Sequence, residues 1–163
     1  MKYIKYFLML LVAFCIGCED EPIENMQGKV TKYGECKNST NFYKSNVTRS
    51  ESCIYFTYNG TDKLILKHIN AGFNCCPNGI YTTISLNGNK LIINEHENSN
   101  DCRCLCLYDI EMEVNNINPG NYTIIINEPY AEYGPPLEFD ANLTTIITDS
   151  VCVARNYYPW GYN

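Results

Sequence analysis

Cysteines are the side chains whose type and spacing could carry chemistry in this chain. Residues 102–106 read C-R-C-L-C, and an adjacent pair, Cys75 and Cys76, stands upstream. Such thiolates, joined by His68 or His96, could bind Zn²⁺ or Cu⁺ or take part in redox reactions. However, C-x-C-x-C lies along a strand, whereas structural zinc sites favour cysteines two to four residues apart on turns. A thiol-based metal or redox protein therefore stays as the alternative to a disulfide framework.

The N-terminal segment indicates export. Lys2 and Lys5 precede an uncharged apolar run over 7–17, which is typical of a secretory signal and short of the about 20 residues that a membrane helix needs. The following C-I-G-C resembles the lipobox of bacterial lipoproteins, with Cys15 in place of the usual leucine. That resemblance implies a signal peptide over 1–17 and a lipid on Cys18, which would hold the protein on a membrane. The alternative is a plain secretory signal with an incidental Cys18.

The charge pattern restricts both the predicted cellular location and the classes of binding partner. An acidic run at 19–21 resembles the surface-export signal of lipoproteins from Bacteroides-type bacteria, and we predict an outer-membrane protein exposed at the cell surface, with a periplasm-facing one as the alternative. Residues 1–17 hold two of the twelve basic residues and none of the eighteen acidic ones, so the remainder has a side-chain charge of −8. This acidity excludes nucleic acid as a natural partner. We expect a lipidated linker over 18–28 and a single domain over 29–163.

An even number of cysteines in an exported chain favours disulfides. Eight remain after Cys15 and Cys18, and all are disulfide candidates: Cys36, Cys53, Cys75, Cys76, Cys102, Cys104, Cys106 and Cys152. Neighbouring cysteines on one strand are badly placed to bond each other. The economical scheme therefore joins the three cysteines of C-x-C-x-C to Cys75, Cys76 and one of the other three.

The rest of the chain is typical of an all-β protein, because it is rich in Tyr, Ile and Thr and has turn signals at short intervals. We predict an antiparallel β-sandwich, Ig-like or similar, with hairpins joining 52–58 to 64–69 and 80–86 to 90–94. A long strand over 101–114 should form a third hairpin with 122–127, and 137–148 and 151–155 should be strands. Alternation along the long strand places one set of side chains together in the core: Cys102, Cys104, Cys106, Tyr108, Ile110, Met112 and Val114.

Several motifs resemble those of an uncharacterised family of small lipoproteins from Bacteroides-type gut bacteria. They are F-N-C-C-P at 73–77, C-R-C-L-C-L-Y-D-I at 102–110, P-G-N-Y-T-I at 119–124, C-V-A-R at 152–155 and Y-P-W at 158–160. The resemblance covers about residues 50–163. It implies a secreted, lipid-anchored, β-rich domain, and it implies no enzymatic activity.

Other candidate residues point to binding. Tyr130 and Tyr133 belong to a loop rich in Tyr and Pro, where exposed aromatic rings could contact a glycan or a protein. Ser150, in D-S-V, resembles the acceptor of Bacteroides-type O-glycosylation. Nucleophile-elbow, H-E-x-x-H and phosphate-loop motifs are absent, so we predict no catalytic residue, no cofactor and no metal. The sequence favours a non-catalytic binding protein whose ligand it does not identify.

Overall fold

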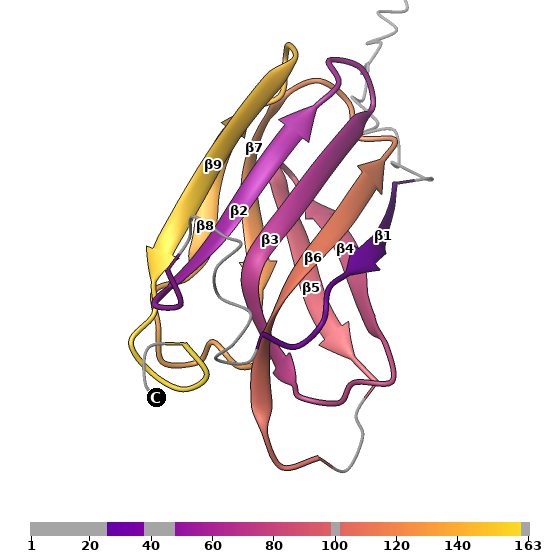
Figure 1. Ribbon diagram of the computed structural model, residues 1–163. Coiled ribbons are helices and arrows are strands. Elements are labelled where there is room, and N and C mark those ends of the chain that lie inside the picture. The colour runs from indigo at the N-terminus through magenta and orange to yellow at the C-terminus, as the bar shows by residue number, and fades with distance from the viewer. Residues whose placement is uncertain (1–25, 38–47, 99–101, 161–163) are drawn as a thin grey trace, which may run out of the picture.

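The computed structural model describes residues 26–37, 48–98 and 102–160, and the predicted signal peptide, Cys18 and most of the linker lie outside these ranges (Figure 1). The described residues form two packed sheets, as predicted for a β-sandwich. The strands are β1 (Gln27–Tyr33), β2 (Glu51–Tyr58), β3 (Lys63–Asn74), β4 (Ile80–Asn87), β5 (Lys90–Glu97), β6 (Leu105–Asn115), β7 (Asn121–Asn127), β8 (Leu137–Asn142) and β9 (Ile147–Ala154). Within these ranges, no helix has the length and apolar character needed to cross a membrane.

The strands are ordered β1-β6-β3-β2-β9 in one sheet and β4-β5-β7-β8 in the other. Two of the predicted hairpins are confirmed, because β2 pairs with β3 and β4 pairs with β5. The third is wrong: β6 pairs with β1 and β3, whereas β7 pairs with β5 and β8. The Pro-Gly turn at 119–120 reverses the chain but carries it into the opposite sheet. The β5–β7 pair is consequently parallel, so the sandwich is not purely antiparallel.

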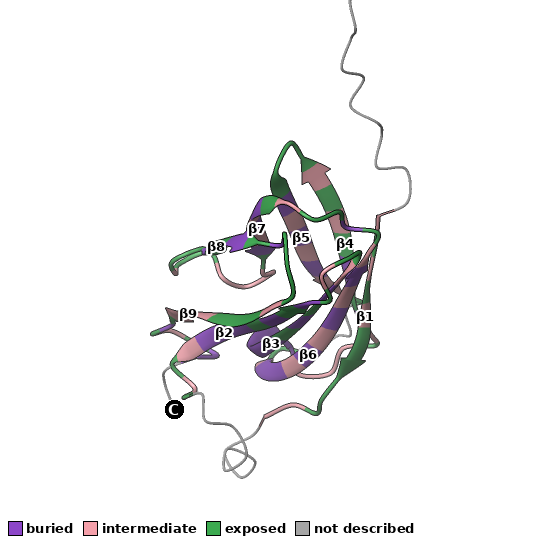
Figure 2. Ribbon diagram, turned by 90° about the horizontal axis from the view of Figure 1, so that it is seen from above, coloured by how far each residue is buried: buried purple, intermediate pink, exposed green. Residues whose placement is uncertain are grey.

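Residues at alternate positions of the strands are buried between the two sheets (Figure 2). Phe56 of β2 stacks on Phe139 of β8, with ring centroids 5.1 Å apart, so this contact joins the two layers. The predicted strand over 137–148 is interrupted at 143–146, where the chain passes from β8 in one sheet to β9 in the other. Leu143 is buried at this crossing, which explains why the apolar pattern looked continuous.

The long strand begins later than predicted. Its alternation holds from Cys106 to Val114, whose even-numbered side chains are buried. Cys102 and Cys104, by contrast, precede β6 and are exposed, so the prediction that they lie on the buried face is wrong. The strand begins at Leu105, which is also where its pairing with β3 begins, opposite Asn74.

The disulfide framework is confirmed. C-x-C-x-C bonds to the adjacent pair and to one further cysteine, through Cys102–Cys76, Cys104–Cys75 and Cys106–Cys36. The fourth bond, Cys53–Cys152, joins directly opposite residues of β2 and β9 and closes 99 residues of sequence. Loops of this size give a disulfide its largest entropic effect on the unfolded chain.

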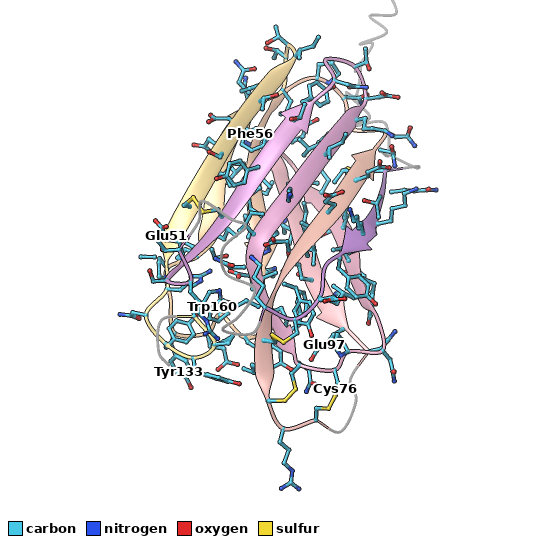
Figure 3. All side chains as sticks on the ribbon, in the orientation of Figure 1. Glu51, Phe56, Cys76, Glu97, Tyr133 and Trp160 are labelled. Atoms are coloured by element: carbon cyan, nitrogen blue, oxygen red, sulfur yellow. A yellow bond between two sulfur atoms is a disulfide. The ribbon has the colours of Figure 1, made fainter. Side chains whose placement is uncertain are left out.

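The C-terminal tail is fixed against the sandwich by Trp160, which is fully buried, as expected for a side chain that closes one end of the fold. Its ring lies so close to Gly72 of β3 that a β-carbon there would stand 2.6 Å from Trp160 Cη2. Trp160 Nε1 also donates a hydrogen bond of 2.7 Å to the carbonyl of Asn70. Trp160, Tyr133 and Cys76 lie toward the same end of the sandwich (Figure 3).

Candidate functional site

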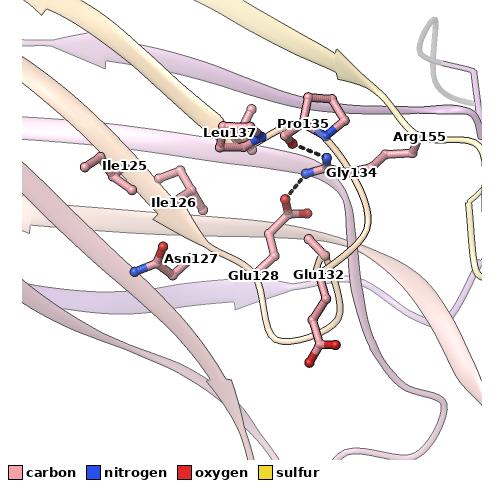
Figure 4. Close-up of a pocket in the computed structure, with 11 residues that line it drawn as sticks. Ile125, Ile126, Asn127, Glu128, Glu132, Gly134, Pro135, Leu137 and Arg155 are labelled. Atoms are coloured by element: carbon pink, nitrogen blue, oxygen red, sulfur yellow. Dashed lines mark hydrogen bonds and ion pairs between the residues drawn. The ribbon is translucent and has the colours of Figure 1, made fainter.

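The loop between β7 and β8 borders a pocket of about 240 Å³ (Figure 4). The end of β7 supplies one wall, with Ile125 and Asn127, and the loop supplies the other. Its charged lining residues are Glu128, Glu132 and Arg155. The pocket therefore combines an apolar floor with a few polar groups, which is the usual composition of a small-molecule site.

The two predicted ligand contacts differ in their surroundings. Tyr133 has 85% of its surface exposed and lies between two pocket-lining residues, Glu132 and Gly134. Tyr130 is half-buried and donates a hydrogen bond of 2.6 Å to Glu97 Oε1. That hydrogen bond, with burial, raises the pKa of Tyr130 to about 12. Tyr130 therefore anchors the loop to β5, while Tyr133 is available for contact.

A buried polar cluster backs the pocket. The Arg155 guanidinium contacts a Glu128 carboxylate oxygen and donates to the Pro135 carbonyl (Figure 4). Ser52 Oγ donates to the other Glu128 oxygen at 3.2 Å. His68 Nε2 lies 2.7 Å from Ser52 Oγ, and His68 Nδ1 lies 2.7 Å from Glu95 Oε1. The side chains that form ion pairs in this cluster are 0–1% exposed; they are His68, Glu95, Glu128 and Arg155.

The hydrogen bonds of this cluster define its protonation. Because the Ser52 hydroxyl proton points to Glu128, the Ser52 oxygen is left to accept from His68 Nε2, and Nδ1 faces a carboxylate. Burial by itself lowers the pKa of His68, but the Glu95 and Glu128 carboxylates outweigh it and raise that pKa. Burial raises the pKa of Glu95, against the opposing effect of His68. When His68 is protonated, the positive charges of His68 and Arg155 balance the negative charges of Glu95 and Glu128, so the cluster has no net charge.

Ser52, His68 and Glu95 are linked in the order of a Ser-His-acid triad, although the chain has no nucleophile-elbow motif. A catalytic serine must place its oxygen against a substrate carbonyl. Ser52 has no exposed surface, and the pocket is lined by Glu128 and Arg155 rather than by Ser52 or His68. The arrangement is thus a buried polar core that is largely hydrogen-bonded within itself, although Glu95 Oε2 and Arg155 Nε lack a hydrogen-bond partner among the described residues.

A sequence signal for this cluster does exist. Ser52, His68 and Glu95 each occupy a core-facing position of a strand whose other core-facing residues are apolar. His68 was correctly expected on an apolar strand, but its partners come from positions far apart in sequence. The β2–β3 pairing brings Ser52 to His68, and the packing of the two sheets brings Glu95 of β5 to them.

The cysteine-rich tip forms a second group of interest. The Sγ atoms of Cys75, Cys76 and Cys102 lie within 4.8 Å of one another, close enough for a shared metal ion if all were thiolates. Each is instead half of a disulfide, and a disulfide sulfur is a poor metal ligand. His96 is not part of this group, since its Nε2 lies 2.9 Å from Thr83 Oγ1.

Ser150 is exposed on β9, at the edge of its sheet, so it is accessible for modification. Two acidic side chains of β6 form ion pairs with lysines: Asp109 with Lys37, which follows β1, and Glu113 with Lys29 of β1 and Lys63 of β3. Comparison of the chain with family models, with curated proteins and with solved structures gives no match.

Proposed function

We propose that this protein is an exported, lipid-anchored and non-catalytic binding protein whose ligand docks at the β7–β8 loop and its pocket. The observation that carries the proposal is Tyr133, an aromatic residue with 85% exposure that stands in the chain between Glu132 and Gly134, two residues that line a pocket of about 240 Å³. Exposed aromatic rings are the side chains that most often dominate binding energy. A disulfide-stabilised lipoprotein, of the kind that the sequence resemblance implies, would present this site outside the cell.

The rigidity of the loop supports the proposal. Arg155 holds the Pro135 carbonyl, and Tyr130 holds the loop to Glu97. At Gly134 the loop backbone comes so close to the cluster that a β-carbon would stand 2.7 Å from Arg155 Nη1. A loop that is already ordered loses less entropy on binding, which favours affinity.

The test uses the purified chain from residue 18 on arrays of glycans and of extracellular proteins. Tyr133→Ala should weaken binding by at least about tenfold, as expected for an aromatic hot spot. Tyr55→Ala is the matched control, since Tyr55 is exposed on the outer face of the other sheet and should leave binding unchanged. Binding that tolerates Tyr133→Ala would overturn the proposed site.

A thiol-based function is the second candidate, and the 4.8 Å grouping of Cys75, Cys76 and Cys102 favours it. The chain would then act after reduction of its two tip disulfides by an external dithiol. Zn²⁺ titration of the reduced protein should give one ion per chain in the wild type. A Cys76→Ser/Cys102→Ser variant should bind none, while Cys53→Ser/Cys152→Ser should still bind. Absence of stoichiometric zinc in the reduced wild type would remove this candidate.

A further inference from the structure

The outer face of the second sheet carries a row of uncharged polar side chains. Thr83 of β4 lies opposite Asn94 of β5, which lies opposite Asn127 of β7. Asn127 Nδ2 donates to Asn94 Oδ1 at 2.7 Å, and Asn94 Nδ2 lies 3.5 Å from Thr83 Oγ1. We call these three residues the Asn–Thr row. Neighbouring strands are about 4.8 Å apart, so the row crosses about 10 Å of sheet.

An aromatic platform flanks the row. Tyr81 stacks on His96, the residue opposite it, with ring centroids 5.1 Å apart and planes inclined by 24°. Tyr81 is 43% exposed, and His96 is tied to the row by its contact with Thr83. One exposed ring thus lies beside side chains that can both donate and accept hydrogen bonds.

The row leads into the pocket, because Asn127 belongs to both. This continuity makes one surface of the platform, the Asn–Thr row and the pocket. The second sheet is seen as a layer of its own, with β4, β5 and β7 side by side and β8 beyond them (Figure 2).

Charge decides which ligand this surface suits. Glu138 and Asp140 are exposed on the neighbouring β8, and Glu132 lies at the pocket, so carboxylates border the surface. Lys90 is exposed on the same face of β5, but these three carboxylates outnumber it, so an anionic ligand would meet net repulsion there. Ile92 and Ile125 are half-buried on the same face, but the row itself offers amides and a hydroxyl, whereas the core of a protein interface is rich in apolar and aromatic residues.

We propose that this surface binds a neutral oligosaccharide, with sugar rings packed on Tyr81 and hydroxyl groups bonded to the Asn–Thr row, and with one end of the chain in the pocket. This inference rests on the proposed binding function and names its ligand class. The hydroxyl groups of a sugar are both donors and acceptors, as are the amides of Asn94 and Asn127. The hydrogen bonds within the row fix those amides before the ligand arrives, which favours binding.

The experiment applies the purified chain to an array of neutral oligosaccharides, printed beside their sialylated and sulfated counterparts and beside extracellular proteins. Tyr81→Ala and Asn94→Ala should each lower affinity for a neutral glycan by at least about tenfold. Tyr55→Ala is the control, because Tyr55 has nearly the same exposure, 42%, on the opposite sheet. Thermal unfolding of each variant near that of the wild type excludes misfolding as the cause.

The remaining outcomes separate this inference from the proposed function. Loss of neutral-glycan binding with Tyr133→Ala but not with Tyr81→Ala would keep the loop site and overturn the row as a sugar site. Preference for sialylated or sulfated glycans, or binding to proteins alone, would overturn the inference while leaving the binding function in place. Absence of binding to every array would overturn both.

Discussion

Replacing Glu128 by Gln should destabilise the fold strongly, although the two side chains have nearly the same shape. Glu128 and Arg155 are 1% and 0% exposed, and the Glu128 carboxylate is the acidic partner of the Arg155 guanidinium. The amide oxygen of Gln can still accept from Ser52, but its NH2 group would then face the Arg155 guanidinium, donor against donor, so the change removes both the charge and the Arg155 hydrogen bond. Removing one partner of a buried ion pair costs about 3–5 kcal/mol, because the other charge stays buried and uncompensated.

The size of this effect is large against the stability of one domain, which is about 5–15 kcal/mol. With a urea m-value of about 2 kcal/mol/M, a loss of about 4 kcal/mol lowers the unfolding midpoint by about 2 M. The assay is urea unfolding at pH 7 with all disulfides intact, followed by circular dichroism. Glu132→Gln, in the same loop but exposed, is the control and should change stability by less than about 0.5 kcal/mol.

A double variant tests the mechanism rather than the size. Glu128→Leu/Arg155→Met removes both charges, and apolar replacement of a whole buried pair is often neutral or stabilising. The double variant should therefore be more stable than Glu128→Gln alone. A cost below about 1 kcal/mol for Glu128→Gln, or a double variant less stable than the single one, would refute the description of this pair as buried and mutually dependent.

Three further predictions address the cluster, the tail and the anchor. Because the pKa values of His68 and Glu95 are raised, the folded protein binds more protons than the unfolded chain. The stability that His68 contributes is therefore complete below its ordinary pKa of 6.5 and is lost as the pH rises through the pKa that His68 has in the folded protein. The urea midpoint should fall from pH 6 to pH 9, less steeply in His68→Gln, and an equal slope in both would contradict the assignment. Gly72→Ala should cost about 1–3 kcal/mol by displacing Trp160, whereas Gly79→Ala, whose β-carbon would meet its nearest atom at 3.5 Å, should cost little in the same assay. Cys18→Ala should abolish incorporation of labelled palmitate in the native host and release the protein from the membrane fraction, and retained label would exclude Cys18 as the lipidated residue.

The sequence was informative where a feature depends on neighbours in the chain. The turn at Asn59-Gly60 predicts the β2–β3 hairpin, and the alternation of β6 predicts which residues of that strand are buried. Parity and the predicted export favour a disulfide framework, and strand geometry points C-x-C-x-C to Cys75, Cys76 and one further cysteine, whereas Cys36 as that third partner was left open. The local sequence does not determine which sheet β7 joins, because the turn at 119–120 is compatible both with a hairpin to β6 and with a crossing to the opposite sheet.

The candidate site was only partly predictable for the same reason. The composition of the loop with Tyr133 marks it as a candidate binding site. The Asn–Thr row, by contrast, depends on the β5–β7 pairing, which places Asn94 beside Asn127 only after the chain has passed to the other sheet and returned. Asparagine and threonine are common in this chain. Nothing local marks these three residues as neighbours.

The buried cluster links stability to the proposed site. An apolar core of the same volume would be as stable or more stable than buried charges, so stability alone does not account for five polar side chains in this position. The cluster also fixes the position of the pocket wall, because Arg155, a member of the cluster, donates a hydrogen bond to the carbonyl of Pro135, which lines the pocket. Apolar residues could fill that space but could not hold a loop carbonyl. The polar core therefore belongs with the binding surface that it supports, which is why we expect Arg155→Met to weaken ligand binding even in the variant background where stability is restored.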